Sequence, residues 1–128
     1  MTAEIARVSP ATMAPPGGHY SHAVAACGLI FISGQLPIKS DGTRLVEASF
    51  EEQARQALDN VARALRAAGS SIDRLVQVRV YVTNIESWLA FNTIYAEWAG
   101  ESRPARAVVP VPGLHYGFQI EVEAIAVQ

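Results

Sequence analysis

The chain has 128 residues, half of them hydrophobic, a length and composition that suit one domain with a hydrophobic core. Its 10 basic and 12 acidic residues are interspersed and give a formal net charge of -2, which disfavours nucleic acid as the main partner. A single cysteine, Cys27, excludes intrachain disulfides and cysteine-cluster metal sites. Without a signal-peptide layout or an apolar run near the ~20 residues that span a bilayer, we expect a soluble cytoplasmic protein with no membrane partner.

Residues 1–18 include proline and glycine pairs, which favour a loose arm over a helix, and we place this arm at residues 1–17. The arm leads into His19-Tyr20-Ser21-His22, four hydrogen-bonding side chains at the entry to the first strand. The two histidines have a spacing that metal ligands use, but only distant His115 and unplaced carboxylates remain to complete a site, so we expect no metal. Tyr20 either reaches into a pocket with its phenol or lies at the edge of the core.

Residues 22–26 and 29–33 read as two short strands of a hairpin, joined by a tight turn that includes Gly28. Ser33 and Gly34 close the second strand. Because glycine has no side chain, Gly34 either offers an unobstructed backbone N–H to a ligand or is an ordinary strand-ending glycine.

The signals after this hairpin predict a loop over residues 36–48 and then a helix. Ser49 and Glu52 form a capping box, and the helix ends before Gly69. Apolar residues recur at helical spacing through this segment, at Phe50, Ala54, Ala57, Leu58, Val61, Leu65 and Ala68.

A long strand is predicted over residues 72–83, with different residue types on its two faces. One face, which suits packing under helices, consists of Val76, Val78, Val80 and Val82. The other face is too mixed for a core and too apolar for plain solvent, so we expect it to meet another subunit; it consists of Leu75, Gln77, Arg79 and Tyr81.

A second helix follows over residues 85–99, capped by Asn84. Its aromatic stripe, which we assign to the core, consists of Trp88, Phe91, Tyr95 and Trp98. Asn92 falls at the margin of the stripe, where an amide needs a partner in the protein or in a ligand.

The last quarter of the chain holds two strand-like runs that carry charges. Arg106 enters a valine-rich run directly after Pro104. In the run over residues 120–127, the period of two places Glu121 on a partly apolar face. Either these charges lie on a solvated face, or Arg106 grips a small carboxylic acid while Glu121 moves a proton or a water beside it.

The order of these elements predicts an α+β sandwich, in which two α-helices cover one face of a single mixed β-sheet. A trimer or another closed ring would bury the opposite face, and clefts between its subunits would then be natural binding sites.

Five motifs in this order and spacing match a known family in register from about residue 17 to residue 127. They are Gly18-His19-Tyr20-Ser21, Ile32-Ser33-Gly34-Gln35-Leu36-Pro37, Gln53-Ala54-Arg55-Gln56-Ala57-Leu58-Asp59-Asn60-Val61, Pro104-Ala105-Arg106 and Ile120-Glu121-Val122-Glu123-Ala124-Ile125-Ala126-Val127. The chain resembles the reactive intermediate deaminase family of the RidA/YjgF type, as one domain over residues 1–128. This resemblance implies a homotrimer of chorismate-mutase-like subunits with three interfacial pockets. It also implies hydrolysis of 2-imino acids and 2-aminoacrylate enamines to 2-keto acids and ammonia, with neither a metal nor an organic cofactor.

The resemblance also implies roles for individual residues. Arg106 matches the family arginine that grips the substrate carboxylate, and Glu121 matches the carboxylate that positions the attacking water and shuttles protons. The other positions that line the family's pocket are Tyr20, Ser33, Gly34, Asn92 and Val108.

The chain departs from the family pattern at several of these positions. Val108 stands where Cys or Thr is common, and His19 and His22 replace residues that are Pro and Gln in many relatives. The 114–118 segment is more aromatic than in archetypal members, so it either admits a larger substrate, such as an aminomuconate-type enamine, or only packs a loop. An alternative to catalysis is a sensor that binds a small carboxylate without turnover.

Overall fold

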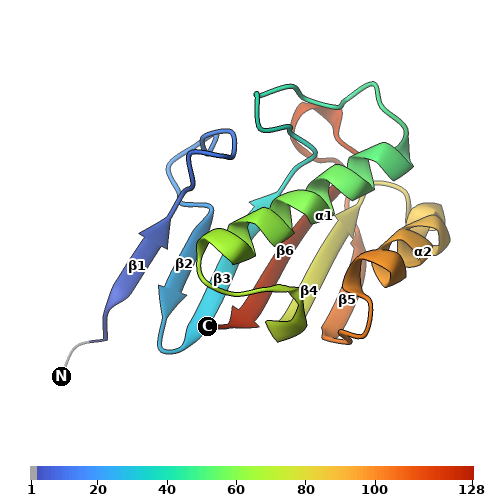
Figure 1. Ribbon diagram of the computed structural model, residues 1–128. Helices are drawn as coiled ribbons and strands as arrows, with labels where there is room; N and C mark the ends of the chain where they lie inside the picture. The colour runs from blue at the N-terminus through green and yellow to red at the C-terminus, as the bar shows by residue number, and fades with distance from the viewer. Residues whose placement is uncertain (1–2) are drawn as a thin grey trace.

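The computed structural model describes residues 3–128, which form a six-stranded sheet with two helices on one face (Figure 1). The strands are β1 (Ile5–Val8), β2 (Ala23–Ala26), β3 (Leu29–Gln35), β4 (Leu75–Val82), β5 (Ala105–Pro110) and β6 (Ile120–Val127). The helices are α1 (Phe50–Ala67) and α2 (Trp88–Ala99). Short 3₁₀ turns lie at Ile72–Arg74, Ile85–Ser87 and His115–Gly117.

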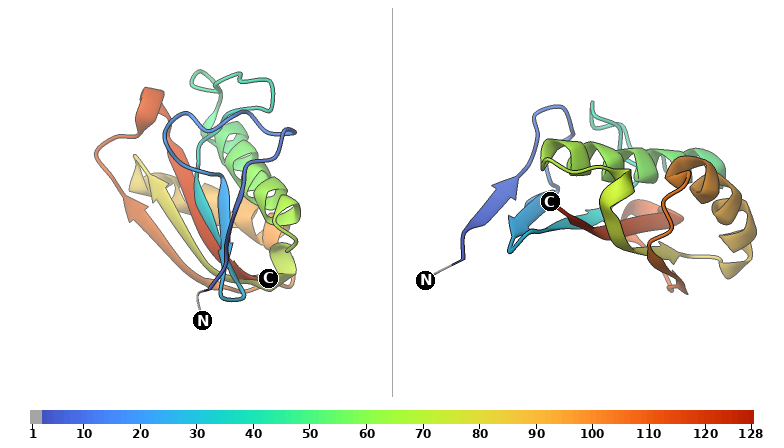
Figure 2. Two further views of the ribbon diagram at one scale, coloured as in Figure 1. Left: turned by 90° about the vertical axis from the view of Figure 1, so that its left-hand side faces the viewer. Right: turned by 60° about the horizontal axis from the view of Figure 1, so that its bottom comes forward.

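The strand order is β1-β2-β3-β6-β4-β5, and only the β4–β5 pair is parallel. Both helices lie on the same side of the sheet, and its other side carries none (Figure 2). The predicted α+β sandwich is therefore confirmed, while its assembly into a trimer stays a prediction. Neither helix is long and apolar enough, within residues 3–128, to cross a membrane.

The predicted loose arm is wrong in its first part. Residues Ile5–Val8 form strand β1, which pairs antiparallel with β2 from Ile5 opposite Ala26 to Val8 opposite Ala23. The backbone groups at the edge of β2 need partners, and a four-residue segment ahead of the proline-rich stretch is enough to supply them. The hairpin that the sequence does predict, β2 with β3, therefore lies inside the sheet.

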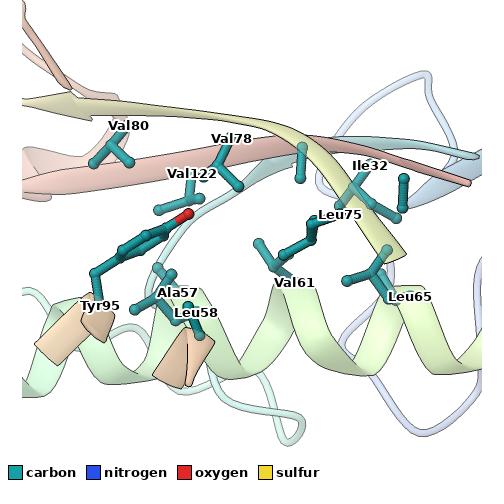
Figure 3. Close-up of a cluster of buried hydrophobic side chains, with 14 of the residues drawn as sticks. Ile32, Ala57, Leu58, Val61, Leu65, Leu75, Val78, Val80, Tyr95 and Val122 are labelled. Carbon is teal, nitrogen blue, oxygen red and sulfur yellow. The ribbon is translucent and has the colours of Figure 1, made fainter. Parts of the chain in front are cut away.

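Helix α1 forms as its capping box predicts. The Ser49 side chain accepts a hydrogen bond of 3.2 Å from the backbone N–H of Glu52, and the chain leaves the helix through Gly69 at φ +87°. The apolar face of α1 packs onto the sheet, where Leu58 and Val61 face Val78 and Val122 (Figure 3). This contact forms the centre of the hydrophobic core.

Strand β4 begins with an irregularity that reverses the predicted faces of its first two residues. Leu75 is buried and points toward α1 (Figure 3). Val76, in contrast, is 45% exposed. The pairing with β6 shifts between Leu75 and Gln77, so the alternation of β4 regains its predicted phase only at Val78. Val78, Val80 and Val82 are fully buried, as predicted.

The aromatic stripe of α2 is only partly in the core. Phe91 and Tyr95 are buried, Trp98 is half-buried, and Trp88 is 42% exposed. Asn84 acts as a cap, as predicted, although its side chain accepts from the N–H of Glu86 in the 3₁₀ turn before α2 rather than in α2 itself.

The irregular start of β4 can be tested with a pair of matched truncations. Leu75→Ala removes a buried side chain and should lower the free energy of unfolding by about 2–4 kcal/mol. Val76→Ala removes an exposed one and should change it by less than about 0.5 kcal/mol. Urea denaturation followed by circular dichroism measures both, and a larger loss for Val76→Ala would contradict the reversed phase.

Candidate active site

A pocket of about 420 Å³ opens where β3 ends and β6 begins, and it contains four of the predicted site residues. These four are Tyr20, Ser33, Gly34 and Glu121. The remaining lining residues come from the segment before Tyr20, the loop after β3 and the turn before β6; they are Gly17, Gly18, Leu36, Ile38, His115 and Tyr116.

A β-bulge at Ser33 and Gly34 shapes the floor of the pocket. Ile32 pairs with Ala124 and Gln35 pairs with Val122, so two residues of β3 stand opposite one residue of β6. The Ser33 hydroxyl donates a hydrogen bond of 2.6 Å to the Ser21 carbonyl, and the Gln35 amide donates to the Ser33 carbonyl at 3.1 Å. These bonds hold the bulged backbone in one conformation.

Gly34 lies directly under the carboxylate of Glu121. A Cβ atom at position 34 would overlap Oε2 of Glu121 and lie 2.9 Å from its Cδ atom. The absence of a side chain at Gly34 therefore makes room for the carboxylate, a reason for glycine that neither sequence interpretation included.

The surroundings of Glu121 favour its protonated form. Burial raises the pKa of this carboxyl above the ordinary 4.5, and the negative charge of Glu123 raises it further, while His115 opposes the shift. A carboxyl that holds its proton to higher pH than a surface glutamate suits both accepting and donating a proton during a reaction.

Arg106 belongs to a second group of residues under helix α2. In the parallel β4–β5 pair it stands beside Val78, which faces the helices. Its guanidinium donates a 2.8 Å hydrogen bond to Oδ1 of Asn92 and lies 4.8 Å from the centroid of the Tyr95 ring. Asn92 therefore has a protein partner, and that partner is Arg106.

Val108 follows Arg106 on the same face of β5. Its side chain is half-buried and packs against the core, so only its backbone remains for the binding role that the resemblance implies.

Glu121 and Arg106 lie on opposite faces of the sheet. Glu121 pairs with Tyr81 on the helix-free face, whereas Arg106 lies on the helix-covered face. One chain therefore brings Tyr20, Ser33, Gly34 and Glu121 together and separately brings Asn92 and Arg106 together, but it does not join the two groups.

His115 and Tyr116 line the pocket, while Phe118 is buried. The 114–118 segment therefore does more than pack a loop. Sequence analysis missed Arg44, whose guanidinium lies 3.7 Å from the centroid of the Tyr116 ring. No motif marks Arg44, because it lies in a loop of irregular pattern and reaches Tyr116 only through the fold.

His22 has structural partners. Its Nε2 lies 2.7 Å from the Ala14 carbonyl, and its Nδ1 lies 3.2 Å from the Gln35 amide nitrogen, so the ring ties the arm to β3. Among residues 3–128, no three His, Cys, Asp or Glu side chains gather where they would hold a metal ion.

A Gly34→Ala substitution should move the carboxylate and leave the strand in place. The overlapping atom is the end of a flexible side chain and Gly34 has no positive φ, so the free energy of unfolding should change by less than about 1 kcal/mol. The pKa of Glu121, followed by NMR, should move toward 4.5 as the carboxylate leaves its half-buried position. Gly113→Ala, at an open position, is the control, and a large loss of stability with an unchanged Glu121 titration would contradict the arrangement.

The titration of Glu121 also tests the charges around it. In the wild type the midpoint should lie above 4.5, because burial disfavours the ionised form. His115→Ala should raise it further and Glu123→Gln should lower it. Since the folded pKa exceeds the unfolded one, the stabilisation from this carboxyl is present below the unfolded pKa and disappears as pH rises through the folded pKa. A midpoint at or below 4.5 would contradict the burial of this group.

The chain is similar to known proteins along nearly its whole length. Residues 11–128 match the family described as Endoribonuclease L-PSP. Protein HMF1 of Saccharomyces cerevisiae is 38% identical over 128 residues, covering 100% of this chain and 95% of HMF1. A Capra hircus protein named 2-iminobutanoate/2-iminopropanoate deaminase is 37% identical over 129 residues, covering 100% of this chain and 94% of that protein. The crystal structure of Escherichia coli TdcF with bound serine matches with a TM-score of 0.89 at 28% identity, covering 96% of this chain and 98% of TdcF. With matches along nearly its whole length, the chain belongs to the endoribonuclease L-PSP family, the RidA/YjgF family that its motifs resemble.

Proposed function

We propose that this protein hydrolyses reactive 2-imino acids, and the 2-aminoacrylate-type enamines that precede them, to 2-keto acids and ammonia. The observation that carries the proposal is the half-buried Glu121 carboxyl, held over the bare backbone of Gly34 in a pocket of about 420 Å³. The name of the Capra hircus relative, a 2-iminobutanoate/2-iminopropanoate deaminase, supports the same chemistry.

Glu121 acts on water and on the leaving nitrogen in this proposal. The ionised carboxylate accepts a proton from water as the water oxygen attacks C2 of the protonated imine. The carboxyl then returns that proton to the nitrogen. The C2–N bond breaks and ammonia leaves, while the regenerated Glu121 carboxylate takes the proton of the C2 hydroxyl so that the carbonyl forms. One group performs both transfers because burial raises its pKa, which makes it a stronger base than a surface glutamate and brings its two protonation states closer in free energy.

Arg106 holds the carboxylate of the substrate. Its guanidinium is permanently charged and, within residues 3–128, uses one donor to bond Asn92. Among residues 3–128 no carboxylate forms an ion pair with it, so the remaining donors are available for a bidentate contact. Asn92 and the ring of Tyr95 fix the orientation of the guanidinium before substrate arrives.

A second copy of the chain supplies Arg106 to each site in this proposal. Glu121 and Arg106 lie on opposite faces of one sheet, so a substrate that contacts both must lie between two subunits. The helix-free face is suited to association because it exposes Phe31 and Val76 beside a linked set of polar side chains. In that set, Glu123 accepts a hydrogen bond from Tyr81 and lies 3.5 Å from Arg79. A homotrimer closed through this face gives three equivalent sites.

RNA cleavage, which the family description names, has less support here. The net charge is -2, and the pocket centres on a carboxylate that would repel a phosphate backbone.

A coupled assay tests the proposed reaction. An amino-acid oxidase generates 2-iminobutanoate, and semicarbazide traps the imine that remains. The wild type should deplete the imine, and Arg106→Ala should lose roughly 100-fold or more in kcat/KM because two charge-assisted hydrogen bonds are lost. Arg103→Ala is the matched control, since Arg103 is exposed and precedes β5. If the wild type binds 2-keto acids but does not deplete imines, the protein is a binding protein and the catalytic proposal is wrong.

The same assay tests the position of the site between subunits, through complementation. Arg106→Ala and Glu121→Ala should each be inactive alone, whereas co-expressed chains should form some interfaces in which both residues are intact. Random mixing in a ring should restore roughly a quarter of the wild-type activity. Failure of mixed oligomers to recover any activity would contradict a shared site.

A further inference from the structure

Tyr116 has a backbone conformation that an aromatic residue rarely adopts. Its φ is 62° and its ψ is 6°, and Gly117 follows at φ +84°. Side chains other than Gly, Asn and Asp are disfavoured in this left-handed region, and strained residues of this kind gather at functional sites. The turn would form more easily with glycine or asparagine at position 116, so the ring itself needs an explanation.

The Tyr116 ring is held from two directions. The Arg44 guanidinium, from the loop after β3, lies 3.7 Å from the ring centroid. On the side of its own turn, the ring of Phe118 lies edge-on at 5.9 Å, and Phe118 is itself buried. Tyr116 nevertheless remains 48% exposed and lines the pocket, so it presents a positioned aromatic surface to a ligand.

Tyr20 presents a second aromatic surface in the same pocket. It is 50% exposed, and both tyrosines border the Gly17–Gly18 segment. A Cβ atom at Gly17 would lie 3.8 Å from the Tyr116 hydroxyl, and one at Gly18 would lie 3.4 Å from the Tyr20 ring. The two glycines keep the space beside both rings open, which leaves a pocket larger than a three-carbon acid requires.

We propose that Tyr116, held by Arg44, is a specificity-determining residue that selects acids with planar, unsaturated or aromatic side chains. This inference rests on the proposed function, in which a partner's arginine holds the carboxylate of the substrate and Glu121 acts at its C2 atom. The side chain of that substrate then extends toward Tyr116 and Tyr20, where a π system stacks on the rings. A branched aliphatic side chain of similar size gains burial there but no aromatic stacking.

The first test measures binding with stable products. Phenylpyruvate and 4-methyl-2-oxopentanoate share the 2-keto acid group and differ in whether the side chain is aromatic or branched aliphatic. Isothermal titration calorimetry on the wild-type protein should give about 3- to 10-fold tighter binding of phenylpyruvate, the range expected for one favourable aromatic pair. Equal affinities, or tighter binding of the aliphatic acid, would overturn the proposal.

Variants of Tyr116 and Arg44 test whether Tyr116 causes the preference for phenylpyruvate. Tyr116→Phe keeps the ring and should keep the ratio of affinities, whereas Tyr116→Leu should bring the ratio close to one. Arg44→Ala should also reduce the ratio, because the ring loses the contact that positions it. Since Arg44 is exposed in a loop, this variant tests the proposal even where Tyr116→Leu does not fold. Arg55→Ala is the control, because Arg55 pairs with Glu97 away from this pocket and should leave the ratio unchanged.

Measuring the hydrolysis of imines distinguishes a failure of the specificity role of Tyr116 from a failure of the proposed deaminase function. If the imines of phenylalanine and leucine are both hydrolysed, and the ratio of their kcat/KM values is the same in wild type and Tyr116→Leu, the specificity role fails and the deaminase function stands. If neither imine is hydrolysed but the keto acids bind with the aromatic preference, the deaminase function fails and the specificity role of Tyr116 stands for a binding site.

Discussion

The contact between the Glu121 carboxylate and the backbone of Gly34 is the constraint on which the rest of the pocket depends. The carboxylate occupies the space that a side chain at position 34 would need, so its present position depends on the glycine in the β3 bulge. The same closeness excludes solvent from one side of Glu121 and contributes to the burial that raises its pKa. The close approach of Glu121 to Gly34 therefore explains both the need for glycine at position 34 and part of the raised pKa of Glu121.

The register of the sheet determines which charged residues lie on the same face as the Glu121 carboxyl. A period of two fixes Glu121 on the helix-free face, and the parallel pairing of β4 with β5 fixes Arg106 on the other. Moving either residue by one position would bring both charges to one face, but it would also turn an apolar residue out of the core. The separation is therefore built into the register, and the proposed sharing of a site between two copies rests on the sheet rather than on any flexible segment.

Much of this arrangement could be predicted from the sequence because it depends on local patterns. The capping box at Ser49 predicted the start of α1, and the alternation from Ile120 onward predicted which face Glu121 would occupy. The phase of β4 at Leu75 was not predictable, because Leu75 and Val76 are both apolar and the sequence does not show which of them faces the core. Nor was strand β1, which forms because the edge of β2 is available to it.

In the pocket too, some residues are indicated by sequence motifs, whereas others come together only through the fold. Family motifs indicate Tyr20, Ser33, Gly34 and Glu121, and the structure places all four in one cavity. They say nothing of Arg44, which lies far from Tyr116 in sequence and stacks on its ring. Since an aromatic residue at positive φ is less stable than glycine would be there, the ring persists only with such support from its neighbours. The aromatic surface formed by Tyr116 therefore lies in loops, whose conformations are set by contacts across the fold rather than by local sequence.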